Sequence, residues 1–267
     1  MELICLGVGA GKSMVYDGET SSAFLLRKNV MSGDDSVVHS GAHGEGLLLI
    51  DCGLGVVRAC LQHVSAVPPL IYVTHNHTDH AGELPVVLAV ERSRPGGFKR
   101  TVVAERRVAT VLKERRLHET SSVGAYDAEW IICDEGRMTP ISRELTIKVL
   151  GPCQHTELCF GFILYRQSRG IDKGMDSRIE AEYEPMFAFT GDTGFRPELF
   201  QQVSKAPIIL ADAREQGTYE HASFEELFQW RQTSGYKGRL VIYHYGMASQ
   251  APSEMYLKSG LEVALPG

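Results

Sequence analysis

Three histidines and one aspartate fall within six positions of the sequence, residues 75–80, and this stretch constrains the fold more than any other. It follows residues 70–73, a short apolar and β-branched run that predicts a buried strand. It precedes residues 83–92, whose pattern predicts a helix. The stretch is therefore expected at the end of a strand, which is where open α/β folds bind their ligands.

The residue types in this stretch are those that bind divalent metals. Neutral imidazole and carboxylate are ligands for borderline divalent ions, zinc above all. His75 and His77 are two positions apart, so in an extended turn both side chains can face one point. Asp79 and His80 are adjacent and are expected to face a second point nearby. The alternative, a solvated polar loop, leaves the spacing of four ligand-type residues unexplained.

Three more ligand-type residues also stand shortly after apolar runs that predict strands. They are His155, Asp192 and His244, and the predicted strands before them span residues 145–150, 186–189 and 240–243. Each residue alone has an ordinary alternative as a turn, core or surface side chain. The recurrence of one arrangement at several strand ends favours a single convergent site.

The pattern His-x-His-x-Asp-His after an apolar strand resembles the hallmark of the metallo-β-lactamase fold superfamily of metallohydrolases. This resemblance covers nearly the whole chain and implies an α+β fold, an αββα sandwich in which two packed mixed β-sheets are flanked by helices. It implies a single domain over residues 1–267. The order of predicted strands and helices fits two halves, before and after about residue 150.

The same resemblance implies two divalent metal ions, with zinc foremost and manganese or iron as alternatives. A hydroxide shared between the two ions would be the nucleophile. Asp51 would form hydrogen bonds near residues 74–80, the histidine loop, instead of binding metal. Asp79 would be a catalytic residue as well as a metal ligand. The implied ligands are His75, His77 and His155 for the first ion, Asp79, His80 and His244 for the second, and Asp192 as a bridge between them.

Two further residues distinguish the branches of this superfamily. True β-lactamases lack the bridging aspartate, so Asp192 argues against them. Asp212 and His221 resemble a pair in the phosphodiesterase branch, which includes ribonuclease Z, where the histidine acts as a general acid on the leaving oxygen and the carboxylate orients it. The acid here is aspartate instead of glutamate, and Ala211 stands where that branch has histidine. These departures, with the lack of a long basic Gly/Pro-rich arm, weigh against tRNA processing more than against phosphodiester chemistry.

The favoured function is a binuclear metal-dependent phosphodiesterase whose substrate is a small phosphodiester, a cyclic nucleotide or RNA. Two alternatives remain open: a hydrolase of thioesters or other acyl compounds of the glyoxalase II type, and a non-catalytic scaffold of the same fold. Cleavage of bis(p-nitrophenyl) phosphate without cleavage of S-lactoylglutathione separates the first hypothesis from the second. Chelator-insensitive folding and no bound metal would favour the scaffold.

Composition limits the partners and the compartment. The net charge of −6 disfavours RNA. The six cysteines are scattered and lie mostly in apolar runs, and no basic leader or apolar run of membrane-spanning length is present. We therefore expect a reduced, cytoplasmic protein that does not enter membranes, and a homodimer is left open.

Three weaker features of the sequence carry less information. The run at residues 7–13 resembles a P-loop but lacks its first glycine, because Leu6 stands there. His39 and His43 lie in a polar stretch, where surface histidines are the simpler interpretation. Residues 166–184 form a mixed-charge excursion that is either a lid over the site or a plain surface loop.

Overall fold

The computed structural model describes residues 1–28, 45–93, 99–118, 128–167, 183–246 and 255–265. His39, His43 and most of the segment 166–184 lie outside these ranges. No helix in the described ranges is both long enough and apolar enough to cross a membrane.

The first β-sheet has the strand order β14-β1-β2-β3-β4-β5-β6. Strands β14, β1, β2 and β3 pair antiparallel, whereas β3, β4, β5 and β6 pair parallel. Parallel neighbours bring the ends of β3, β4 and β5 to one edge of the sheet. The strands are β1 (Glu2–Gly7), β2 (Ala23–Arg27), β3 (Gly46–Ile50), β4 (Leu70–Tyr72), β5 (Thr101–Glu105), β6 (Glu129–Cys133) and β14 (Glu262–Ala264).

The second β-sheet has the order β12-β11-β10-β9-β8-β7, and β13 pairs with β11 as well. Strand β11 runs parallel to β10, β12 and β13, so the ends of these strands also meet at one edge. The strands are β7 (Met138–Pro140), β8 (Leu145–Leu150), β9 (Gly161–Gln167), β10 (Tyr183–Phe189), β11 (Ile208–Arg214), β12 (Ala222–Ser223) and β13 (Arg239–Tyr243).

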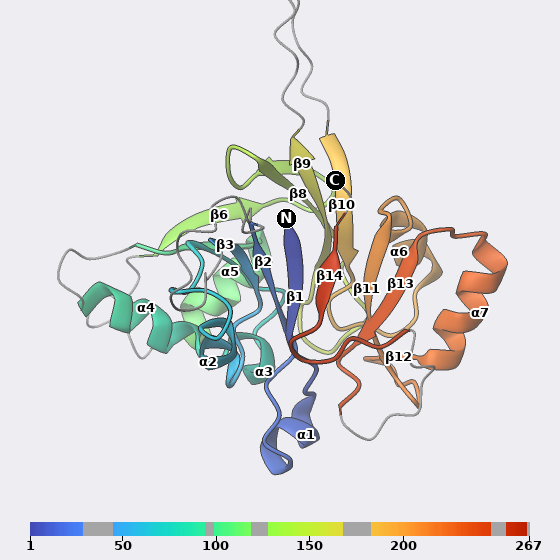
Figure 1. Ribbon diagram of the computed structural model, residues 1–267, viewed down its shortest axis with the longest axis horizontal. Coiled ribbons are helices and arrows are strands. Elements are labelled where there is room, and N and C mark those ends of the chain that lie inside the picture. Colours follow the sequence, from blue (N-terminus) through green and yellow to red (C-terminus); the bar gives the residue numbers. More distant parts are fainter. Residues whose placement is uncertain (29–44, 94–98, 119–127, 168–182, 247–254, 266–267) are drawn as a thin grey trace, which may run out of the picture.

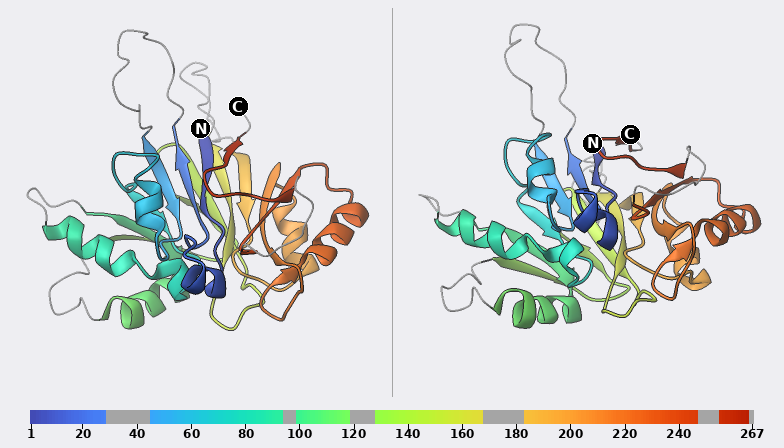
Figure 2. Two further views of the ribbon diagram at one scale, coloured as in Figure 1. Left: turned by 60° about the horizontal axis from the view of Figure 1, so that its bottom comes forward. Right: turned by 90° about the horizontal axis from the view of Figure 1, so that it is seen from below.

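Helices cover the outer sides of the two sheets. Helices α2, α4 and α5 lie on the side of the first sheet, and α6 and α7 on the side of the second (Figures 1 and 2). Helix α7 begins at a capping box in which Ser223 Oγ accepts the Glu226 N–H, as its sequence predicts. The helices are α1 (Gly11–Tyr16), α2 (Val56–Cys60), α3 (Thr78–Ala81), α4 (Leu84–Ser93), α5 (Arg106–Val111) with the π-helical turn η1 (Leu112–Arg116), α6 (Pro197–Val203) and α7 (Phe224–Ser234).

Aromatic side chains fill the space between the two sheets. Phe24 of β2 packs edge-on against Phe189 of β10, with ring centroids 5.4 Å apart. Phe189 in turn stacks on Tyr243 of β13 at 4.6 Å, and Tyr72 of β4 meets Phe162 of β9 at 4.6 Å. All five side chains are fully buried. These contacts include β4, β10 and β13, whose ends carry predicted ligands, so the core fixes the relative position of the two sheets at that edge.

The predicted αββα sandwich is confirmed, but the predicted division into halves is wrong in two respects. The first sheet ends with β6 at Cys133 and the second starts with β7 at Met138, well before residue 150. Strand β14, near the end of the chain, returns to pair with β1 of the first sheet. Short edge pairings of this kind depend on partners far away in sequence and have no local signal. That residues 1–267 form one domain stays a prediction.

Gly53 shows how closely the first sheet packs against the histidine loop. A Cβ added at this position would lie 1.9 Å from the main-chain oxygen of Asp79, so the neighbouring backbone would have to move. We expect Gly53→Ala to lower the free energy of unfolding by about 1–3 kcal/mol, visible as a lower Tm. Gly11→Ala is the matched control, because no atom lies within 4 Å of its added Cβ. Equal Tm values for the two variants would contradict this packing.

Candidate functional site

The histidine loop changes direction between its two pairs of predicted ligands. His75 and His77 follow β4 on extended backbone, and His77 is the N-cap residue of α3. Asp79 and His80 lie within the single turn of α3, which begins at Thr78, before the helix that the sequence predicts from residue 83. The turn directs the second pair of side chains to a different point from the first.

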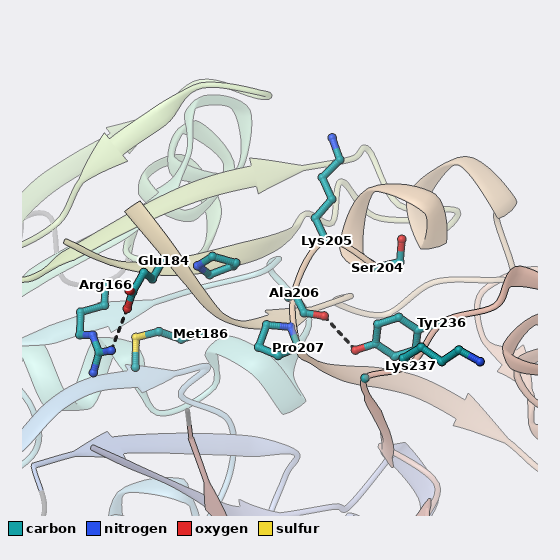
Figure 3. A pocket seen from close by; sticks show the side chains of 11 residues that line it. Arg166, Glu184, Met186, Ser204, Lys205, Ala206, Pro207, Tyr236 and Lys237 are labelled. Carbon is teal, nitrogen blue, oxygen red and sulfur yellow. Dashed lines mark hydrogen bonds and ion pairs between the residues drawn. The ribbon is translucent and has the colours of Figure 1, made fainter. Parts of the chain in front are cut away.

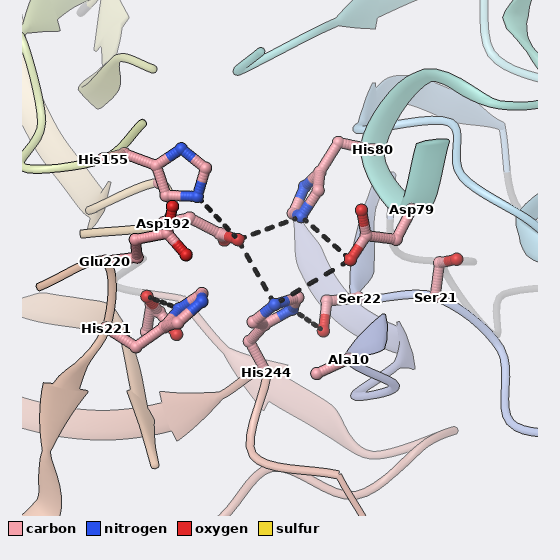
Figure 4. Close-up of polar contacts among 12 residues, drawn as sticks. Ala10, Ser21, Ser22, Asp79, His80, His155, Asp192, Glu220, His221 and His244 are labelled. Atoms are coloured by element: carbon pink, nitrogen blue, oxygen red, sulfur yellow. Dashed lines mark hydrogen bonds and ion pairs between the residues drawn. The ribbon is translucent and has the colours of Figure 1, made fainter. Parts of the chain in front are cut away.

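The structure brings the seven predicted ligands together at the edge between the sheets, six of them in two groups and Asp192 between the groups. Figure 4 shows Asp79, His80, His155, Asp192 and His244 at this edge. Within each group the potential ligand atoms lie within 4.8 Å of one another. One group comprises His75, His77 and His155, and the other comprises Asp79, His80 and His244.

Asp192 lies between the two groups. Its Oδ2 atom is 3.3 Å from His80 Nε2, 3.2 Å from His244 Nε2 and 4.0 Å from His155 Nε2. Asp192 is only 2% exposed, and it follows β10 in the sequence. One carboxylate thus faces imidazoles of both groups, as a bridging ligand must.

The electrostatics of two buried imidazoles, His75 and His244, suit metal ligands. Burial, with the charge of neighbouring His80, holds the pKa of His75 well below its usual value. Burial also lowers the pKa of His244 to about 3. Both rings are therefore neutral near pH 7, which is the form that binds metal. For His80, burial is outweighed by the charges of Asp192 and Asp51, which raise its pKa.

Several buried polar atoms at the centre of these groups have no hydrogen-bond partner among the residues that the structure describes. They include His75 Nε2, His80 Nε2 and Asp192 Oδ1. Unpartnered polar atoms are costly to bury, so their convergence on one point calls for a bound cation. Imidazole nitrogen and carboxylate oxygen are ligands that zinc accepts. The residues present therefore fit two divalent ions, and their roles as ligands remain a prediction.

Hydrogen bonds to the far side of the rings fix their orientation. Asp51 Oδ2 accepts from His80 Nδ1 at 2.8 Å, and Asp51 Oδ1 accepts the Thr74 N–H at 2.8 Å. Thr74 Oγ1 lies 3.0 Å from His75 Nδ1, and Ser22 Oγ lies 3.0 Å from His244 Nδ1. Each contact leaves Nε2 directed at the centre. The sequence predicted such a position for Asp51 but gave no indication of Ser22.

Two of the residues in this network have left-handed backbone. Asp51 has φ 62° and His244 has φ 63°, and they are the non-glycine residues with positive φ in the described ranges. Each residue follows a strand, and the sharp turn places its side chain at the strand end instead of continuing the alternation along the strand.

Asp212 and His221 form a hydrogen-bonded pair beside the two groups. Asp212 Oδ2 accepts from His221 Nδ1 at 2.8 Å and from the Thr193 N–H at 2.9 Å. Burial opposes protonation of His221, but the hydrogen bond and the charge of Asp212 outweigh it and raise the pKa of the ring. The His221 ring lies 5.4 Å from His244 and 5.9 Å from His155 between centroids. A histidine that is hydrogen-bonded to a buried carboxylate therefore stands next to the candidate metal centre.

Arg116 is a residue at this loop that sequence reasoning did not identify. It ends η1, where the Leu117 N–H donates to the Leu112 carbonyl at 2.9 Å, five residues back. Arg116 Nε donates to Asn76 Oδ1 at 3.0 Å, and a second guanidinium nitrogen donates to the Asn76 main-chain oxygen. Asn76 lies between His75 and His77, so Arg116 holds the backbone that carries two predicted ligands. The sequence shows a basic helix but not the π turn that aims this arginine.

We expect Arg116→Ala to weaken metal binding about tenfold to a hundredfold, the usual effect of losing a group that orients ligands. A zinc titration against a competing chelator measures this directly, without an activity assay. Arg115→Ala is the matched control, since that neighbouring side chain is 66% exposed and its ion pair is with Glu157, at 3.7 Å. Equal zinc affinity in the two variants would show that the Asn76 contact does not support the loop.

One hollow in the described part of the molecule is separate from this site. It has a volume of about 610 Å³ and is lined by residues including Arg166, Glu184, Lys205 and Tyr236 (Figure 3). These residues lie near the starts of β10, β11 and β13 or on the adjoining segments, whereas the predicted ligands follow the ends of strands. No histidine lines it.

Comparisons with known proteins agree with this geometry. The sequence matches the family described as anti-Pycsar protein Apyc1 over residues 1–260. No curated protein matches the sequence. The metallo-β-lactamase fold protein YhfI from Bacillus subtilis is 14% identical, with a TM-score of 0.66 over 98% of this chain and 99% of that one.

Two further solved structures extend the likeness. The short form of human tRNase Z is 16% identical, with a TM-score of 0.61 over 100% of both chains. Zn²⁺-bound PqqB from Methylobacterium extorquens is 13% identical, with a TM-score of 0.65 over 99% of this chain and 100% of that one. These likenesses show that the chain has the metallo-β-lactamase fold.

Proposed function

The chain belongs to the family of the anti-Pycsar protein Apyc1, and from this premise we propose that it is a binuclear metal-dependent phosphodiesterase. The first candidate substrates are a small phosphodiester and a cyclic nucleotide. RNA is a weaker candidate because the net charge is −6.

The observation that carries this proposal is the Asp212–His221 pair beside the two ligand groups. Cleavage of an alkyl phosphodiester expels an alkoxide, which is strongly basic and needs a proton as it leaves. A thioester expels a thiolate, which is stable near neutral pH without one. A proton donor held by a buried carboxylate therefore favours phosphodiesters over the glyoxalase II type of substrate.

In this proposal the chain supplies the ligands, the proton and the orientation of both. His221 donates a proton from Nε2 to the leaving oxygen, because its Nδ1 is engaged by Asp212. Asp212 favours the doubly protonated ring, fixes its orientation and is itself held by the Thr193 N–H. When bound at the two groups, divalent ions would activate a water molecule and stabilise the negative charge that develops on the phosphoryl oxygens.

The proposal is tested with purified protein supplied with zinc or manganese. We expect cleavage of bis(p-nitrophenyl) phosphate and of a 3′,5′-cyclic nucleotide, no cleavage of S-lactoylglutathione, and loss of activity with a chelator. Metal analysis should find two ions per chain. Turnover of S-lactoylglutathione alone would overturn the proposal, and a metal-free, inactive protein would favour a scaffold.

A cytoplasmic location is proposed as well. The six cysteines are buried and form no disulfide within the described ranges, which agrees with the proposed cytoplasmic location. The oligomeric state, for which a homodimer is left open, can be measured by light scattering.

A further inference from the structure

Arg214, the last residue of β11, lies on the face of that strand that points to the site. Side chains alternate along a strand. Ile208 and Leu210 belong to the core between the two sheets, whereas Ala211 and Ala213 pack on the outer side. Asp212 and Arg214 continue the inner series, so both side chains leave the strand toward the edge where the ligand groups lie.

The neighbouring strands place Arg214 between two residues of the site. Strand β12 pairs with the end of β11, Arg214 opposite Ser223, and His221 immediately precedes β12. Strand β13 pairs on the other side, with Asp212 opposite Tyr243, and His244 immediately follows. His221 and His244 therefore flank the end of β11 that carries Arg214.

The guanidinium of Arg214 has no partner among the described residues. Its Nε atom is buried without a hydrogen bond, and none of the described residues forms an ion pair with the side chain. Other partly buried arginines are satisfied: Arg27, for example, pairs with Glu2 and Glu262 at 2.9 and 2.6 Å. A partly buried cation without a counterion is costly, so an anionic ligand is expected at this point.

We propose that Arg214 binds the phosphate group of the substrate, on the side where His221 faces the leaving oxygen. This inference rests on the proposed phosphodiesterase function. The planar guanidinium can donate two parallel hydrogen bonds to non-bridging phosphate oxygens. Arg214 would then hold the phosphodiester in line with the proton donor, while the ligand groups hold the ions.

The test compares Arg214→Ala and Arg214→Lys with wild type, all loaded with zinc. The probe is inorganic phosphate, measured by calorimetry and as a competitive inhibitor of bis(p-nitrophenyl) phosphate cleavage. We expect the dissociation constant of phosphate to rise roughly tenfold to a hundredfold in Arg214→Ala. Arg214→Lys should recover part of the loss. Zinc content and Tm should stay close to those of wild type.

Arg239→Ala is the control, because Arg239 begins β13 at the far end of the same sheet and is exposed. Phosphate affinity unchanged within twofold in both Arg214 variants would overturn the inference, as would loss of zinc from both. If wild type binds phosphate through Arg214 but cleaves no phosphodiester, the proposed function fails and the anion site stands. If wild type cleaves phosphodiesters and the variants bind phosphate normally, the proposed function stands and the anion site at Arg214 fails.

Discussion

Asp192→Asn is expected to lose bound metal and turnover together. Asp192 Oδ2 lies 3.3 Å from His80 Nε2 and 3.2 Å from His244 Nε2, so one carboxylate serves both ligand groups. Asparagine keeps the shape but removes the charge that offsets two divalent ions. We expect at least one ion per chain to be lost and the rate of phosphodiester cleavage to fall by roughly a hundredfold to a thousandfold or more. Metal analysis and steady-state kinetics on the same sample measure both.

The matched control for this change is Asp134→Asn. Asp134 is a carboxylate with 40% of its side chain exposed, and its ion pair at 2.9 Å is with Arg106 on the surface. It should retain two ions and full activity. If Asp192→Asn still bound two ions, the bridging role of Asp192 would be wrong, whatever the activity of the variant. Binding of only one ion by wild type would likewise rule out Asp192 as a bridge between two ions.

His221→Ala is expected to keep both ions and to lose turnover selectively. The ring is not among the seven predicted ligands and is tied to Asp212 at 2.8 Å, although one of its nitrogen atoms lies within 4.8 Å of potential ligand atoms of Asp192 and His244. General acid catalysis contributes typically about a hundredfold to ten thousandfold, and the contribution matters most when the leaving oxygen is basic. We therefore expect a loss of that order with a cyclic nucleotide. The p-nitrophenolate of bis(p-nitrophenyl) phosphate leaves without help, so that rate should change much less.

The ratio of the two rates is the measurement that separates this role from others. Equal losses on both substrates would indicate that His221 supports the metal centre or substrate binding instead of donating a proton. Asp212→Asn should show the same selectivity, because asparagine lacks the charge that raises the pKa of the His221 ring and so leaves less of the ring protonated. Zinc content close to two ions per chain is the necessary control for both variants.

The ligand groups were predictable because each depends on local sequence. His75, His77, Asp79 and His80 are fixed by their spacing in one loop, and the strand before them is an unbroken apolar run. His155 and His244 are isolated, but they follow apolar strands, and parallel strands end at a common edge. The structure places these residues together as that rule requires. Their binding of metal stays a prediction.

The residues that escaped prediction depend on contacts between distant segments. Ser22 reaches His244 across 222 positions of sequence. Arg116 reaches Asn76 because a π turn shifts its direction, and helical periodicity alone does not show such a turn. The pairing of β14 with β1 closes the first sheet from the other end of the chain. Each of these features is decided by packing in three dimensions, for which a run of residue types carries no signal.

The left-handed backbone at Asp51 and His244 costs folding free energy at two residues of the candidate site. A non-glycine residue held in this conformation costs about 1–3 kcal/mol, and Asp51 and His244 both adopt it. Glycine would relieve that cost at either position while deleting a side chain of the site. Glycine at Asp51 would also leave His80 Nδ1 and the Thr74 N–H without their buried acceptor, which costs about 1–3 kcal/mol each. Selection for heat resistance alone would therefore gain little from such a replacement, and the strained backbone is retained together with the hydrogen bonds that it positions.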